Sequence, residues 1–233
     1  MIKRIAALIG AIGFLTSVFV TPSSAFSVGA GVTGGGAYFE ATGTETLRTS
    51  GTTQNAKEDA TAVIGSVYIQ ALVGEEMFGE GNGFVIGFEN FMGEGKFSGT
   101  SQEICDIRGS ETGACLTGNN YAEAVVDNFR TYYVESPTLL GIYLKAGISQ
   151  MDVKSNEELA TGGSYGNVGD VEGEMVGFGF RTPASGGFQV KSDFTYTDWD
   201  SLSVNNTADS TGTSTVSMQP EAWAARLSIG YNF

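Results

Sequence analysis

The sequence predicts an all-β protein, an eight-stranded antiparallel up-and-down β-barrel that crosses a membrane. Three observations support this fold. Eight segments alternate apolar and polar residues with a period of two, which is typical of strands with one apolar face. Short turns and long polar stretches alternate between these segments. The 233-residue chain holds 34 glycines and only four prolines, a composition that suits a narrow and curved sheet wall.

Residues 1–25 are predicted to be a secretory signal peptide. Two basic residues precede an apolar run from Ile5 to Val20, and small residues follow it, so we expect cleavage after Ala25. A retained signal anchor is the alternative. Beyond residue 25 no stretch approaches the ~20 apolar residues that a membrane helix needs. Residues 26–233 are therefore expected to form one barrel domain, because only a closed barrel of strands satisfies the backbone inside a bilayer.

The first strand is expected over about residues 26–41. Its apolar residues change parity at Gly34-Gly35-Gly36, and we interpret this change as a β-bulge that resets the phase. A polar loop is expected over 43–60, followed by a second strand over 61–75. The inward-facing residues of that second strand are Ser66, Tyr68 and Gln70.

The third and fourth strands enclose a loop that contains both cysteines. A turn over 75–82 leads to a third strand in which apolar residues from Phe84 to Phe88 alternate with Gly87 and Glu89. The loop is expected over 98–121 and the fourth strand over 122–135. The phase of the fourth strand is ambiguous. Our interpretation places Val125, Phe129 and Tyr133 outside, and Asn128, Arg130 and Tyr132 inside.

The second half of the chain alternates more regularly. The fifth strand sets five apolar residues, from Leu140 to Ile148, against glycines, Tyr143 and Lys145. Long loops are expected over 154–170 and 200–218. Between them lie two strands whose inward positions include Arg181, Lys191 and Asp193, and the eighth strand ends at Phe233.

The last strand carries the most specific pattern. Trp223, Leu227, Ile229, Tyr231 and Phe233 occupy alternate positions, with aromatic residues at both ends of the apolar face. A terminal Phe233, preceded at alternate positions by Tyr231 and Ile229, resembles the C-terminal assembly signal of bacterial outer-membrane β-barrels. A half-buried strand of a soluble sandwich is the alternative interpretation.

In pattern alone, the whole chain after residue 25 resembles the small OmpA-like, OmpX-like and surface-antigen barrels of Gram-negative outer membranes. The resemblance implies an outer-membrane location, with lipid, lipopolysaccharide and the barrel-assembly machinery as partners. It also implies a structural and surface-contact role through long extracellular loops. A narrow or gated channel for ions or small solutes is the alternative function. We expect a monomer, because a closed barrel leaves no edge to pair.

The inward positions collect charges although the chain as a whole is acidic. The net charge of −14 argues against nucleic-acid partners. Buried charges without partners cost several kcal/mol, so mixed charges inside a barrel imply an ion-paired network. Its predicted members are Glu89, Arg130, Lys145, Arg181, Lys191, Asp193 and Arg226, with Glu40 and Glu174 as further candidates. Such a network either fills the core or acts as a gate.

The cysteines and the absence of histidine narrow the chemistry. Cys105 and Cys115 lie in the exported part, where one loop-closing disulfide is the simplest expectation. Without histidine or further cysteines we expect no metal site and no cofactor. Small barrels that modify lipids resemble one another in using histidine as a general base. A lipid-modifying enzyme is therefore only the third hypothesis, and no catalytic residue is assigned.

Overall fold

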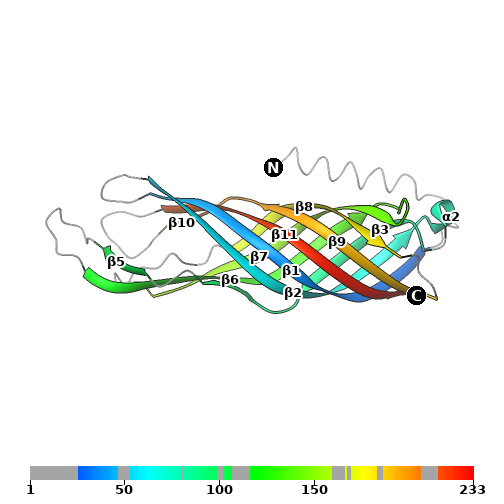
Figure 1. Cartoon of the computed structure of the whole chain (residues 1–233), viewed down its shortest axis with the longest axis horizontal. Coiled ribbons are helices and arrows are strands. Elements are labelled where there is room, and N and C mark those ends of the chain that lie inside the picture. The colour runs from blue at the N-terminus through cyan, green and yellow to red at the C-terminus, as the bar shows by residue number, and fades with distance from the viewer. Residues whose placement is uncertain are drawn as a thin grey trace.

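The computed structural model describes residues 26–46, 53–79, 81–98, 102–106, 116–158, 166, 169–182, 186–205 and 215–233. These residues form a closed antiparallel barrel of eight long strands (Figure 1). Neighbouring strands follow one another in sequence order, and the last strand, β11 (Thr215–Asn232), pairs with the first, β1 (Phe26–Thr46). The predicted eight-stranded up-and-down barrel is confirmed.

The other long strands and the short elements complete the wall. The six remaining long strands are β2 (Thr53–Val73), β3 (Phe84–Phe91), β6 (Leu116–Glu135), β7 (Ile142–Glu158), β8 (Gly169–Arg181) and β9 (Phe188–Trp199). Of the short strands, β4 (Gly95–Ser98) and β5 (Gln102–Asp106) pair with β6, and β10 (Leu202–Asn205) pairs with β11. One helical turn, α2 (Glu75–Phe78), connects β2 to β3.

The two ends of the barrel differ. The short turns, α2 and the C-terminus lie at one end, whereas β5 and β10 lie at the other (Figure 1). Short turns face the periplasm in bacterial barrels, so we name these the periplasmic and extracellular ends. No helix in the described part of the chain is long and apolar enough to cross a membrane.

The outer surface carries a band of exposed apolar side chains. It is formed by alternate residues of each long strand, among them Val32, Val67, Ile69, Leu144, Val176, Phe178, Leu227 and Ile229. Two aromatic pairs that include residues of β11 border it. The ring centroids of Trp223 and Tyr196 are 4.5 Å apart, and those of Tyr231 and Phe233 are 5.2 Å apart. Such a band is the surface that a barrel presents to lipid.

The expected β-bulge at Gly34-Gly35-Gly36 is wrong. The pairing of β1 runs without a shift from Gly29 to Thr46 against β11, and from Phe26 to Thr46 against β2. The parity change has another cause. In the apolar band the apolar residues point outward. Beyond it the outer face meets water, so the apolar Ala37 is buried inside. The strand keeps its phase while its apolar face changes sides.

A real irregularity lies in β6, and it reverses the phase expected there. The register of β6 against β7 shifts between Asp127 and Arg130, where Asn128 has a φ of 50°. An extra residue in one strand exchanges its two faces. Tyr133 is consequently buried at 3% exposure, whereas Tyr132 is exposed at 51%. The predicted placement of Phe129 outside is also wrong, because Phe129 stacks on the buried Phe91 at 4.0 Å.

The four long loops are shorter than expected, because their ends continue the strands. β1 and β2 remain paired up to Thr46 and Thr53, and β7 continues to Glu158. Within the fourth expected loop, β10 pairs with the start of β11. These segments are polar but rich in threonine and serine, and outside lipid a polar face does not prevent pairing. The barrel wall therefore extends well beyond the apolar band.

Candidate functional site: the charged interior of the barrel

The interior of the barrel, the lumen, contains seven buried charged side chains. They come from six different strands and occupy inward positions of the period-two pattern: Glu89, Glu135, Lys145, Arg181, Lys191, Asp193 and Arg226. Burying so many charges is tolerated only when they are paired and hydrogen-bonded. The pairing therefore decides what this site can do.

Arg226 on β11 connects two of the three carboxylates. Its Nη1 donates to Glu89 at 3.0 Å, and its Nε donates to Asp193 at 3.1 Å. Arg226 and Asp193 are directly opposite each other on β11 and β9. The Ser66 hydroxyl also donates to Glu89. This fork-shaped contact uses the fixed donor geometry of a guanidinium group.

Glu135 is the centre of the remaining pairs, nearer the periplasmic end. Arg181 Nη1 donates to it at 3.1 Å and Lys191 Nζ at 3.0 Å. Lys145 Nζ lies 3.7–3.9 Å from Glu89, Glu135 and Asp193, so it joins the two groups. All seven charges thus form one continuous network.

Aromatic rings pack against the wall beside these cations. Lys145 Nζ is 4.0 Å from the ring centroid of Tyr133, and Lys191 Nζ is 4.8 Å from that of Tyr68. The rings fit because glycines stand beneath them: Gly87 under Tyr133, Gly31 and Gly230 under Tyr68, and Gly179 under Tyr143. Several inward glycines are therefore explained by ring packing.

Replacing one of these glycines should disturb the lumen. A Cβ built on Gly230 would overlap the Tyr68 hydroxyl, so Gly230→Ala is expected to destabilise the barrel by about 1–3 kcal/mol, the usual cost of overpacking. Gly34→Ala is the matched control, because nothing lies within 4 Å of a Cβ at that outward position. Urea unfolding in detergent micelles measures both. Equal midpoints would contradict the assigned ring packing.

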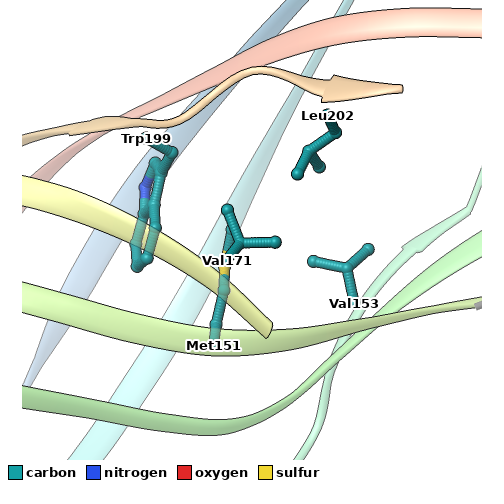
Figure 2. Close-up of a cluster of buried hydrophobic side chains, with 5 residues drawn as sticks. All are labelled: Met151, Val153, Val171, Trp199 and Leu202. Carbon is teal, nitrogen blue, oxygen red and sulfur yellow. The ribbon is translucent and has the colours of Figure 1, made fainter. Parts of the chain in front are cut away.

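An apolar cluster fills the lumen on the extracellular side of the network. Met151, Val153, Val171, Trp199 and Leu202 converge from β7, β8, β9 and β10 (Figure 2). Phe129 packs against Trp199 with ring centroids 5.5 Å apart and also against Phe91, which is near Arg226. The described lumen is therefore occupied at two levels, first by charges and then by apolar side chains.

The structure places six of the seven predicted network residues inside. Arg130 is the exception. Its Nε donates to Gln150 at 2.9 Å, because the irregularity at Asn128 turns it to the outer face. Glu135 was missed for the same reason. It shares the inward face with Tyr133, so the correct phase of β6 would have identified it.

The two further carboxylates suggested for the network are also outside. Glu40 forms an ion pair with Lys57 at 2.7 Å on the outer surface, and Glu174 is exposed on the outer face of β8. Both lie beyond the apolar band, where the outward face of each strand is polar.

Several other predicted features lie partly or wholly outside the described residues. These include the signal peptide, residues 1–25, and Cys115, so the cleavage and the disulfide to Cys105 stay predictions. The residues of the expected assembly signal, Ile229, Tyr231 and Phe233, all face outward. Among the described residues, no group of three or more acidic, cysteine or histidine side chains is placed to hold a metal ion.

Known structures share this architecture at low sequence identity. No family model matches the chain, and no curated protein matches it. The outer membrane protein OprG from Pseudomonas aeruginosa is similar with a TM-score of 0.53 and 13% identity, over 89% of this chain and 96% of that one. The outer membrane protease OmpT from Escherichia coli is similar with a TM-score of 0.43 and 10% identity, over 91% of this chain and 99% of that one. The chain thus has the fold of the small outer-membrane β-barrels.

Proposed function

We propose that this outer-membrane barrel is a surface-contact protein whose functional region is the wall beyond the apolar band. The observation that carries the proposal is the length of β1 and β2, which stay paired beyond the level where the outer surface becomes charged. On β1 and β2 that level is marked by Glu40 and Asp59, which belong to the acidic row, five carboxylates directly opposite one another on adjacent strands: Glu174, Asp198, Glu221, Glu40 and Asp59.

The extension beyond the acidic row is substantial. On β1 it runs from Ala41 to Thr46, paired on both sides with β2 and β11. Six residues at about 3.3 Å each give a wall of roughly 20 Å along the strand. Such a paired wall can hold the connecting loops away from the lipid headgroups, where another surface can reach them.

The occupied lumen supports a structural core rather than a passage. Charged and apolar side chains fill it at two successive levels, as expected for the narrow interior of an eight-stranded barrel. A monomer is proposed because β1 and β11 close the wall. The chain contains no histidine, so we also propose that it is not an enzyme.

The test uses a variant that lacks most of the extension and keeps the rest of the barrel. Residues 42–57 are replaced by Asn-Gly, so that Ala41 and Glu58, which are paired partners, are joined by a two-residue hairpin turn. Intact cells displaying this variant should lose attachment to immobilised matrix proteins and abiotic surfaces. The control Glu40→Gln/Lys57→Gln removes an ion pair and keeps the full hairpin. Equal attachment by cells with and without the wild-type barrel would refute the proposal.

A gated channel is the second candidate, and the seven charges in the lumen favour it. Under our first proposal, wild-type protein in planar bilayers conducts at background. Asp193→Asn leaves Arg226 with one carboxylate fewer and should lower stability by about 1–4 kcal/mol without raising conductance. A stable unit conductance, with a higher open probability in Asp193→Asn, would instead establish the channel.

A further inference from the structure

The charges of the lumen do not balance. Among the described residues, four buried cations face three buried carboxylates. Lys145 lies within 4 Å of all three carboxylates, so one positive charge remains whichever partner it is assigned. Glu75 at the periplasmic end does not supply the missing charge. It accepts hydrogen bonds from Ser27 and the Gly81 N–H and forms no ion pair with a described residue.

Hydrogen-bond donors are also in excess, and a chain of contacts from Lys191 explains why. An ammonium group can only donate, so Gln70 must present its Oε1 to Lys191, at 3.0 Å. Gln70 Nε2 then donates to Gln189 Oε1 at 3.2 Å and to Asn232 Oδ1 at 3.1 Å. The side-chain oxygens of Gln189 and Asn232 must therefore face Gln70, and their NH₂ groups are buried without a partner.

The Tyr68 hydroxyl is a third donor without a partner in the same place. It lies over Gly31 and Gly230, and Gly230 is directly opposite Gln189 on the neighbouring strand. Asn232 lies two residues further along the strand that carries Gly230. Three free donors therefore belong to side chains at neighbouring positions on one patch of the wall, beside Lys191, whose ammonium group is 4.8 Å from the Tyr68 ring centroid.

We infer that this patch binds one small monovalent anion of the halide class, held by Tyr68, Gln189 and Asn232. The anion accepts hydrogen bonds and donates none, and its charge cancels the excess of the lumen. A water molecule satisfies the donors less well, because it adds two further donors and no charge. Asn232 is only partly buried at the periplasmic rim, which provides a route of entry.

Bromide is the probe, because its anomalous scattering locates it directly. Crystals of the full barrel, grown from detergent in sodium gluconate and soaked in sodium bromide, should show a peak within hydrogen-bond distance of Tyr68 Oη and Gln189 Nε2. In solution, the thermal midpoint of the folded barrel should rise with the logarithm of chloride concentration at constant ionic strength, as a ligand specific for the folded state requires.

Gln189→Glu separates the halide site from a general salt effect. The new carboxylate supplies the missing charge, so the midpoint should rise in gluconate and no longer respond to chloride. Gln219→Glu makes the same change on the outer face of β11 and should keep the full response. If Gln189→Glu does not fold, Tyr68→Phe removes one donor and should weaken bromide binding several-fold. No bromide peak at the patch, or a full chloride response in either lumen variant, would overturn the inference.

Discussion

Arg226→Met should destabilise the barrel by about 3–5 kcal/mol, the cost of breaking a buried pair and leaving a charge uncompensated. Arg226 is hydrogen-bonded to both Glu89 and Asp193, so its loss leaves two buried carboxylates with Lys145 as their remaining cation within 4 Å. Urea unfolding of the purified barrel in micelles, followed by the shift between folded and unfolded bands on a gel, measures the loss.

The control and the rescue make this prediction specific. Arg130→Met removes an arginine from the outer face, where its Nε contacts the neutral Gln150, so we expect a change below about 1 kcal/mol. Adding Asp193→Asn to Arg226→Met removes one of the two carboxylates that depend on Lys145 and leaves three buried cations facing two carboxylates, the same excess of one as in the wild type. This double variant should therefore recover part of the lost stability. A double variant as unstable as Arg226→Met alone would mean that packing, rather than charge, is lost.

Deleting Phe233 should strongly reduce the amount of barrel assembled in the outer membrane while changing the stability of refolded protein little. The Phe233 ring is 79% exposed and contacts Tyr231, so it contributes little buried area to the folded barrel. Its N–H donates to Val28 at 2.7 Å where the barrel closes. We therefore expect the main effect during assembly, when the C-terminal strand is recognised.

The measurement compares two settings with the same variants. Folded protein is quantified in outer membranes of expressing cells, and the midpoint of urea unfolding is measured after refolding into micelles. Leu139→Ala, an exposed apolar side chain in a periplasmic turn, is the control and should assemble normally. Assembly of the Phe233 deletion at the wild-type level would remove the assigned role of Ile229, Tyr231 and Phe233 as a signal.

The number of strands and most lumen charges were predictable because alternation is a local property of the sequence. In β7 and β9 the pattern leaves one phase, so Lys145, Lys191 and Asp193 could be placed inside from residue types alone. In β6 it does not. Polar and aromatic residues there occupy both faces, and the shift at Asn128 is set by pairing with β7. Arg130 was therefore placed inside incorrectly, and Glu135 was missed.

The error in β1 had a different origin. A change of apolar parity can arise from a bulge or from a change in what surrounds the strand, and the sequence of Gly34 to Gly36 permits both. The pairing with two neighbours, unbroken on each side, identifies the second cause. The lengths of the strands were underestimated for a related reason. Polar residues that are typical of loops can also pair as strands where both faces of the wall are exposed to water.

The exchange of apolar and polar faces along each strand also fixes how deeply the barrel is immersed. Sliding the molecule inward by two residues, about 7 Å along a strand, would carry the acidic row into hydrocarbon, where charged side chains are costly. Sliding it outward would bring apolar side chains such as Leu227 closer to water. The acidic row spans five adjacent strands, so either displacement affects a large part of the wall. Immersion depth is therefore encoded in the wall itself, independently of any anchor in the loops.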